Sequence, residues 1–458
     1  MNSIFTTGAS ANAIPIWFVT AASYPGVRES LEATARAFAD AAGFEPKAGQ
    51  HLLLPGKSGV GGVLFALEAE NDTKDPFLPG RLPQQLPAGV YRFANDPHDA
   101  RLAALAFALG SYRFTRYHKA NGRDIRLDLP QRLDREDLER VVAAVTLTRD
   151  LVNTPANDMG PGELEDAARA LAARYAADIR VTVGDDLLTQ NYPLVHAVGR
   201  ASAAAPRLIE LAWGEAGHPR VSLVGKGVCF DSGGLDIKPE SAMLLMKKDM
   251  GGAATVLALA QMIMDRKLKL RLAVTIPAVE NAISGAAYRP RDVYRSRKGL
   301  TVEIGNTDAE GRLILADALA RADEAAPELL IDMGTLTGAA RVALGPDLPA
   351  FYTKDDALAA ALARHAAAEN DPLWRLPLWQ PYDAMLDSKV ADLNNVASSS
   401  FAGSILCALF LQRFVAAAKS WLHLDIFAWT PTAKPGRPEG GECQAARAVY
   451  ALLAERYG

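Results

Sequence analysis

The sequence predicts an α/β protein, with a small N-terminal α/β domain and a larger C-terminal α/β domain whose central, mostly parallel sheet is covered by helices. Short apolar stretches alternate with helical stretches along most of the chain, which is the pattern of parallel strands joined by crossover helices. Clusters of Gly and Pro separate these stretches. The chain has 458 residues, 49% of them hydrophobic, which is enough for a large core and for two or three domains.

Residues 1–133 are expected to form the N-terminal domain. An apolar run follows Pro15, and because no Lys or Arg precedes it, we interpret it as a buried strand and not as a secretion signal. Residues 71–89 are rich in Pro, Gly and Asp and are expected to form a loop. The predicted strands cover 16–20, 51–54 and 63–67, and the predicted helices cover 31–42 and 100–112.

A charged helix over 134–152 closes at Asn153-Thr154-Pro155 and is expected to belong to a linker, residues 134–158. The second domain, residues 159–458, continues with strands and helices in alternation. Ligands of such sheets bind beyond the carboxyl ends of the strands, so we expect the chemistry there. The predicted strands are 179–183, 208–212, 221–224, 272–276, 329–332 and 422–426, and the predicted helices are 251–264, 313–322 and 405–418.

Composition and charge narrow the partners and the compartment. The net charge of −4 gives no support for nucleic-acid binding through bulk electrostatics, which favours strongly basic domains. The three cysteines, Cys229, Cys407 and Cys443, form no CxxC pair, which argues against a disulfide framework and a thiolate zinc site. No uninterrupted apolar stretch reaches the length of a membrane helix. We therefore expect a cytoplasmic protein without a membrane partner.

Four acidic residues lie in predicted strand-to-helix loops: Asp231, Asp249, Asp308 and Glu310. Brought together, their negative charges would repel and some carboxyls would take up protons, unless cations neutralised them. Carboxylates suit ions such as Mg²⁺, Mn²⁺ and Zn²⁺. Two such ions, roughly 3.5–4 Å apart, can share a water molecule and make it a hydroxide-like nucleophile. The pattern therefore favours a two-metal hydrolytic site.

The residues alone leave a simpler interpretation open. Acidic residues at helix N-termini are common as caps, and Lys226 and Arg312 could be ordinary surface residues. The seven histidines are scattered and form no HExxH motif, so they do not decide the question. His423, in a predicted strand, is interpreted as a structural residue.

Several segments resemble the leucyl aminopeptidase family, also called the cytosol aminopeptidases. The resemblance covers the chain from about residue 134 to the end. It implies a soluble, metal-dependent aminopeptidase, a hydrolase that acts on peptides with a free N-terminus and assembles as a homohexamer. The segments that carry it are VGKGVCFDSGGLDIKP at 224–239, MKKDMGGAA at 246–254 and NTDAEGRL at 306–313, with further matches at 149–158, 287–294, 332–339 and 392–396.

Residue by residue, the resemblance implies a site for two divalent metal ions per subunit, Zn²⁺ or Mn²⁺. The tighter ion would be held by Lys226, Asp231, Asp249 and Glu310. The exchangeable ion would be held by Asp231, Asp308 and Glu310, so that Asp231 and Glu310 bridge the two. A lysine ligand must be a neutral amine, so the pKa of Lys226 is expected to fall from its ordinary value of ~10.4.

Further residues complete the implied site. Lys238 would polarise the scissile carbonyl and stabilise the oxyanion. Arg312 matches a position that holds a bicarbonate ion, which serves as the general base. Met246, Thr335 and Gly338 match positions that line the pocket for the first side chain of the substrate. Lys238 is also implied to bind the substrate. The free α-amine of the substrate would bind the exchangeable ion, which explains removal of residues from the N-terminus only.

One segment departs from the family pattern. Phe427-Ala428-Trp429-Thr430 follows Ile426, where the family commonly has small residues. We expect Phe427 and Trp429 to reshape the specificity pocket, so that the preferred first residue differs from leucine.

Three alternatives to a plain aminopeptidase stand beside this hypothesis. They are an additional DNA-binding or regulatory role, a catalytically silent scaffold, and a metallo-phosphodiesterase. The complete set of matched residues argues against the scaffold. Two-metal sites also serve phosphate esters, so a substrate test is needed to separate the last alternative from a peptidase.

Overall fold

A computed structural model describes residues 4–6, 12–118 and 123–458. It contains two compact units: Met1–Thr146 with Thr432–Glu439, and Leu147–Pro431 with Gly440–Gly458. The chain passes from the first unit to the second within helix α5 (Arg135–Asn153), which begins and ends close to the predicted helix. The boundaries predicted for the two domains and the linker stay a prediction. Residues 1–3, 7–11 and 119–122 of the predicted N-terminal domain lie outside the described residues.

The first unit is built on a six-stranded sheet in the order β1-β6-β5-β2-β4-β3, in which only β3 and β4 pair antiparallel. The predicted strands and helices of this region are confirmed. The sheet contains β1 (Phe5–Thr6), β2 (Ile14–Val19), β3 (His51–Gly56), β4 (Gly59–Ala66), β5 (Gly89–Phe93) and β6 (Ile125–Asp128), and the helices are α1 (Tyr24–Ser30), α2 (Ala33–Ala41) and α4 (Ala100–Gly110).

The prediction that residues 71–89 form a loop is wrong for residues 78–85, which are helical. A 3₁₀ turn, η1 (Leu78–Arg81), leads directly into the short helix α3 (Leu82–Gln85). Each begins with a proline in its first turn, where the missing N–H costs nothing and the fixed φ favours a helix. Leu82 and Leu86 are completely buried, so this segment has an apolar face. The prediction of a loop relied on its Pro and Gly content and did not consider these leucines.

The second unit is built on a nine-stranded sheet with a parallel centre, which confirms the predicted fold class. Its order is β16-β15-β18-β14-β9-β11-β8-β7, and β10 pairs in parallel with β11. Strands β18, β14, β9 and β11 run parallel to one another. Strand β8 pairs antiparallel with β7 and β11, and β15 pairs antiparallel with β18 and parallel with β16. The strands are β7 (Asp178–Val183), β8 (Arg207–Trp213), β9 (Arg220–Gly225), β10 (Gly227–Asp231), β11 (Arg271–Asn281), β14 (Leu329–Gly334), β15 (Ala350–Tyr352), β16 (Trp374–Arg375) and β18 (Trp421–Asp425).

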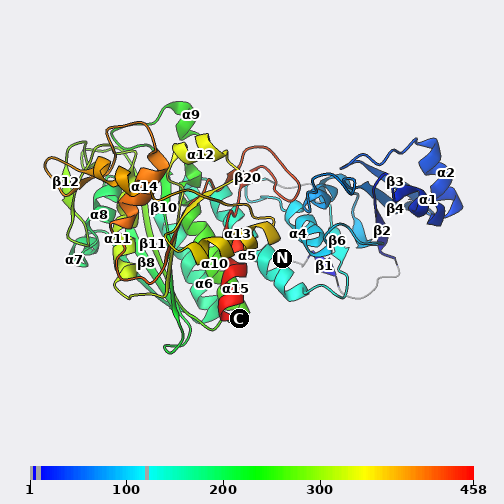
Figure 1. Ribbon diagram of the computed structural model, residues 1–458, viewed down its shortest axis with the longest axis horizontal. Helices are drawn as coiled ribbons and strands as arrows, with labels where there is room; N and C mark the ends of the chain where they lie inside the picture. The colour runs from blue at the N-terminus through cyan, green and yellow to red at the C-terminus, as the bar shows by residue number, and fades with distance from the viewer. Residues whose placement is uncertain (1–3, 7–11, 119–122) are drawn as a thin grey trace. The chain divides into compact units, whose positions relative to one another are not determined.

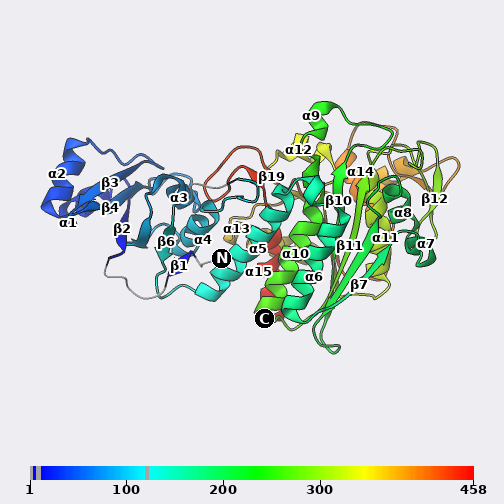
Figure 2. The ribbon, with the colours of Figure 1, turned by 180° about the vertical axis from the view of Figure 1, so that it is seen from behind.

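Helices cover both faces of this sheet, as Figure 1 shows and as Figure 2 shows from behind. Helix α10, predicted from its small residues, is buried from Gly251 to Met264, so it lies in the core. One face carries α6 (Pro161–Tyr175), α10 (Gly251–Arg266), α13 (Asp356–Ala368) and α15 (Ala446–Tyr457), and the other carries α8 (Pro193–Gly199), α11 (Glu310–Asp323) and α14 (Gly403–Gln412). Among the described residues, no helix combines the length and apolar character that crossing a membrane requires.

Two further predictions need correction in the second unit. The helix predicted for 405–418 ends at Gln412. The carboxylate of Asp323 accepts hydrogen bonds from the backbone N–H groups of residues 416–418, which holds this segment in a turn that a helix would not allow. Strand β10 was not predicted, because the glycines in and around it favour a loop. Residues 227–231 nevertheless form a strand, since they pair in parallel with β11.

Candidate metal centre

The four acidic residues predicted to act together lie at the carboxyl edge of the parallel strands. Asp231 is the last residue of β10, and Asp249 lies in the 3₁₀ turn η3 (Met246–Met250) directly before α10. Asp308 precedes α11, and Glu310 is its first residue. One carboxylate oxygen each from Asp231, Asp308 and Glu310 lie within 4.8 Å of one another. The crossover loops therefore bring together residues that are up to 79 positions apart in the sequence, Asp231 and Glu310.

Two lysine ammonium groups lie among these carboxylates. Lys226 Nζ is 2.6 Å from Asp249 Oδ2, 2.9 Å from Glu310 Oε1 and 2.7 Å from the carbonyl oxygen of Thr335. Lys238 Nζ is 2.8 Å from Asp231 Oδ2 and also pairs with Asp308. Four carboxylates thus contact two ammonium groups, in a region where Asp231, Asp249 and Glu310 are at most 2% exposed.

The environment shifts the pKa of two carboxyls upward. Burial, together with the charges of Asp231 and Asp249, raises the pKa of Glu310 to about 8. Burial and the charge of Asp231 raise the pKa of Asp308 to about 6. Burial alone would do the same to Asp249, but the ammonium groups of Lys226 and Lys248 hold the pKa of Asp249 below its ordinary value. The cluster without cations therefore resists full ionisation.

The pKa of Lys226 is raised when only protein groups surround it, whereas the expected fall applies to a lysine beside a metal ion. Burial works against the charged amine, but the carboxylates of Asp249, Glu310 and Asp231 outweigh it and raise the pKa of Lys226 above its ordinary value. The physical reason is that the expectation assumed a neighbouring metal ion. Without one, the ammonium group itself is the cation that the carboxylates bind.

A layer of polar contacts fixes the acidic loops. The amide of Asn281, at the end of β11, donates to Asp231 Oδ1 over 2.8 Å and to the carbonyl oxygen of Thr307 over 3.0 Å. Thr307 N donates to Asp236 Oδ2 and Asp236 N donates to Thr307 Oγ1, each over 2.8 Å. The loop after β10 and the loop before α11 are therefore tied to each other by reciprocal hydrogen bonds.

Gly311 makes room for Lys226. A Cβ atom at position 311 would lie 2.6 Å from Lys226 Cε and 2.7 Å from Nζ, which is closer than van der Waals contact allows. The first turn of α11 can therefore place Glu310 beside the lysine only because the next residue has no side chain.

All ten residues predicted for the site line one cavity of about 390 Å³, with Arg312, Met246, Thr335 and Gly338 beside the carboxylates and lysines. Arg312 Nη1 donates to the carbonyl oxygen of Asn395 over 2.8 Å. The roles assigned to these residues stay predictions. Sequence reasoning missed Lys248, Arg341 and Leu245, which also line the cavity, because nothing in their spacing distinguishes them from surface or core residues.

The two aromatic residues that depart from the family pattern have different surroundings. Phe427 lines the cavity, whereas Trp429 is not among the lining residues and its ring lies beside Lys247, 5.5 Å from Nζ. The expected effect on specificity therefore rests on Phe427.

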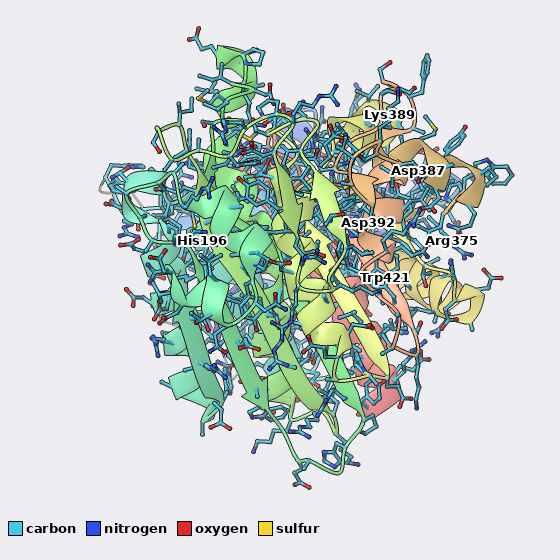
Figure 3. All side chains as sticks on the ribbon, turned by 90° about the vertical axis from the view of Figure 1, so that its left-hand side faces the viewer. His196, Arg375, Asp387, Lys389, Asp392 and Trp421 are labelled. Atoms are coloured by element: carbon cyan, nitrogen blue, oxygen red, sulfur yellow. The ribbon has the colours of Figure 1, made fainter. Side chains whose placement is uncertain are left out.

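The histidines lie elsewhere in the described part of the chain. His423 is completely buried, and its Nδ1 lies 2.6 Å from Asp332 Oδ1, which fits the structural role expected for it. Trp421 Nε1 donates to the other oxygen of the same carboxylate. Figure 3 shows Trp421 on β18 at the right of the sheet and His196 on α8 at the left, where Asp185 is its partner over 3.0 Å.

The donor set fits divalent cations. Among the described residues that line the cavity there is no His or Cys, and the residues predicted as ligands offer carboxylate oxygens and the amine of Lys226. Carboxylates bind Zn²⁺, Mn²⁺ and Mg²⁺. The raised pKa values of Asp308 and Glu310 are what an added cation would lower, because it favours the ionised carboxylates. We therefore regard the cluster as able to hold divalent metal ions.

Two family models match the chain over most of its length. The model of the cytosol aminopeptidase family, catalytic domain, matches residues 146–451, and the model of the M17 aminopeptidase N-terminal domain matches residues 14–130. A probable cytosol aminopeptidase of Chlamydia muridarum is 43% identical over 352 residues, which cover 73% of this chain and 70% of that protein. Peptidase B of Pectobacterium carotovorum is 44% identical over 301 residues, which cover 64% of this chain and 69% of that protein.

Solved structures agree with these matches. The crystal structure of a cytosol aminopeptidase from Coxiella burnetii superposes with a TM-score of 0.95 at 46% identity and covers 99% of this chain and 100% of that one. The bottromycin maturation enzyme BotP, solved in complex with Mn, has a TM-score of 0.87 at 32% identity and covers 97% of this chain and 99% of that one.

Proposed function

Because the chain belongs to the cytosol aminopeptidase family and is a metal-dependent aminopeptidase, we propose that it releases N-terminal amino acids from peptides at a two-metal site. The observation that carries this proposal is the cluster of Asp231, Asp308 and Glu310, with ligand atoms within 4.8 Å of one another. When bound, two divalent cations supply Lewis-acid chemistry and lower the pKa of a water molecule that attacks the peptide bond. The Mn in the BotP complex supports Mn²⁺ as one occupant, beside Zn²⁺.

Each acidic residue has a separate part in this proposal. Asp231 and Glu310 would contribute to both sites, since both are buried and each has a carboxylate oxygen within 4.8 Å of the other acidic residues of the cluster. Lys226 and Asp249 would complete the tighter site, since they are already in contact over 2.6 Å. Asp308, whose side chain is 33% exposed, would complete the site from which the ion exchanges more easily.

Lys238 and Arg312 would act on the substrate side. The pKa of Lys238 lies above its ordinary value, because the attraction of Asp231 and Asp308 outweighs the effect of burial. Lys238 therefore keeps its proton and can donate a hydrogen bond to the scissile carbonyl oxygen as negative charge develops there. Arg312 would hold a bicarbonate ion that takes the proton of the attacking water. Met246, Thr335 and Gly338 would line the pocket for the first side chain.

The test is hydrolysis of aminoacyl p-nitroanilides by the purified chain, supplied with Mn²⁺ or Zn²⁺. We expect release of p-nitroaniline from a free aminoacyl anilide but none from its N-acetylated form, because the free amine is required. Bis-p-nitrophenyl phosphate, a phosphodiester, should not be cleaved. Cleavage of the phosphodiester without cleavage of the anilide would replace the proposal with the phosphodiesterase alternative.

Metal retention is expected to depend on pH. Glu310 and Asp308 have raised pKa values, about 8 and about 6, in the chain without metal, so below these values they hold protons that a cation must displace. Affinity should therefore fall as pH falls, roughly tenfold per pH unit for each displaced proton. After dialysis against metal-free buffer, we expect less bound metal at pH 5.5 than at pH 8.5, measured by mass spectrometry.

Circular dichroism at both pH values is the control, since an unfolded chain would also lose metal. Equal metal content at the two pH values, with the fold intact, would contradict the assignment of Glu310 and Asp308 as ligands.

The remaining expectations stay predictions. They are the homohexamer, the cytoplasmic location, the bicarbonate at Arg312 and the number of ions. Nothing in the described part of the chain favours the additional DNA-binding or regulatory role.

A further inference from the structure

One wall of the cavity carries a basic residue that has no partner. Lys248 is 2% exposed and lines the cavity. Among the described residues, no carboxylate or carbonyl group pairs with its ammonium, and its contact there is the ring of Phe427, with Nζ 4.8 Å from the ring centroid. Burying an ammonium group without a hydrogen-bond acceptor is costly, and an aromatic face offsets that cost only in part.

The preceding residue, Lys247, has a hydrogen-bond acceptor within the protein. Lys247 Nζ donates to the carbonyl oxygen of Asn153 over 2.7 Å and lies beside the ring of Trp429. Lys247 and Lys248 thus each contact an aromatic residue of the segment after β18, but only Lys247 has an acceptor within the protein. The acceptor for Lys248 therefore comes from what occupies the cavity, which is water or a ligand.

A second basic residue lies against the same aromatic ring. Arg341, in the helix α12 (Gly338–Leu344), has its Cζ atom 4.8 Å from the centroid of the Phe427 ring. One of its nitrogens, Nη1, donates to the carbonyl oxygen of Thr337 over 3.0 Å, which fixes the guanidinium group. Because a guanidinium group has five N–H donors, others are free to bind a ligand in the cavity.

The ring that joins these two residues is itself held in place. The side-chain oxygen of Gln444 accepts hydrogen bonds from the backbone N–H groups of Phe427 and Ala428, over 2.9 and 3.0 Å. The arrangement of Lys248, Phe427 and Arg341 is therefore preorganised, which is what selective recognition of a small charged group requires.

The charges of the residues that line the cavity also favour an anionic ligand. Its lining contains four carboxylates and five basic side chains: Lys226, Lys238, Lys248, Arg312 and Arg341. Metal ions bound at the carboxylates would cancel the negative charges and leave the basic residues in excess. An anionic ligand in this part of the cavity would then be attracted and a cationic one repelled.

We propose that Lys248 and Arg341 bind the side-chain carboxylate of an acidic first residue, so that the enzyme prefers peptides that begin with glutamate or aspartate. This inference rests on the proposed function, because it assigns the pocket beside Met246 and Gly338 to the first side chain. Phe427 packs against both basic groups and holds them on one wall of the cavity. Leucine, which has no carboxylate to offer these groups, is therefore a poorer first residue than glutamate.

The test compares glutamyl, glutaminyl and leucyl p-nitroanilides, which carry no other carboxylate. Glutamate and glutamine have the same shape, so the ratio of their kcat/KM values isolates the charge. We expect a ratio of roughly 10 to 100 for the wild type, the range of a charge-assisted hydrogen bond, and a fall towards 1 in Lys248→Met. Lys247→Met is the matched control and should keep the wild-type ratio. Arg341→Gln, on another element, should lower the ratio independently.

Three outcomes would overturn the inference. A wild type that hydrolyses the leucyl anilide but does not distinguish glutamyl from glutaminyl would show that no carboxylate is recognised. An unchanged ratio in both Lys248→Met and Arg341→Gln would show that these residues do not carry the preference. No turnover of any of the three substrates in the metal-loaded enzyme would overturn the proposed function itself, and this inference with it.

Discussion

The variant Glu310→Gln is expected to lose most of its activity and at least one bound metal ion per chain. Glu310 is 1% exposed, lies in the cluster with Asp231 and Asp308, and is paired with Lys226. An amide keeps the size of the side chain but removes its charge and one acceptor. Metal ions stabilise such transition states by several kcal/mol, so kcat should fall by roughly 10²- to 10⁴-fold. The measurements are metal content by mass spectrometry and turnover of an aminoacyl anilide.

The matched control is Glu240→Gln, which makes the same chemical change at an exposed position at the start of the short helix α9 (Glu240–Met243). It should retain the metal and the activity. If Glu310→Gln kept both ions and full turnover, the assignment of the whole cluster as a metal site would be wrong.

Lys238→Met is expected to lower kcat by roughly 10²- to 10³-fold, the effect of removing one donor to a developing oxyanion. Metal content should not fall, because Lys238 pairs with Asp231 and Asp308 as a competing cation and not as a ligand. This combination of lost turnover and retained metal distinguishes Lys238 from Glu310. A variant that lost metal and activity together would instead assign Lys238 to the assembly of the metal site.

Lys238→Arg is the informative conservative variant. It keeps the positive charge but changes the position of the donors, so partial activity is expected. Full activity in Lys238→Met would contradict any role for this residue in the reaction.

The acidic residues could be predicted from the sequence, because parallel strands carry their loops to one edge of the sheet. Asp249, Asp308 and Glu310 lie beside the starts of predicted helices, and Asp231 lies in the segment after the predicted strand 221–224. Their chemistry alone did not exclude helix capping, and the resemblance to a known family was needed to assign individual roles. The exact beginning of α11 at Glu310 was also missed, since the predicted helix began with its first apolar residue.

The arrangement of residues around Phe427 in the cavity could not be predicted. Lys248, Arg341 and Phe427 come from three separate segments. The two that are nearest in the sequence, Arg341 and Phe427, are 86 positions apart, so no local pattern predicts that they lie together. The direction of the pKa shift of Lys226 also depends on whether a metal cation or a carboxylate dominates its surroundings, so the fall expected for a lysine that binds a metal ion stays a prediction. Such quantities follow from long-range packing, which local propensity does not determine.

The reciprocal hydrogen bonds between Thr307 and Asp236 have a consequence for the thermodynamics of metal uptake. They join the loop that carries Asp231 to the loop that carries Asp308, and Asn281 bonds to both. The chain therefore loses the conformational entropy of these loops when it folds and not when an ion arrives. In the language of coordination chemistry, the protein would then be a rigid multidentate chelator, and its affinity for the proposed ions would reflect a chelate effect more than the intrinsic strength of any single carboxylate.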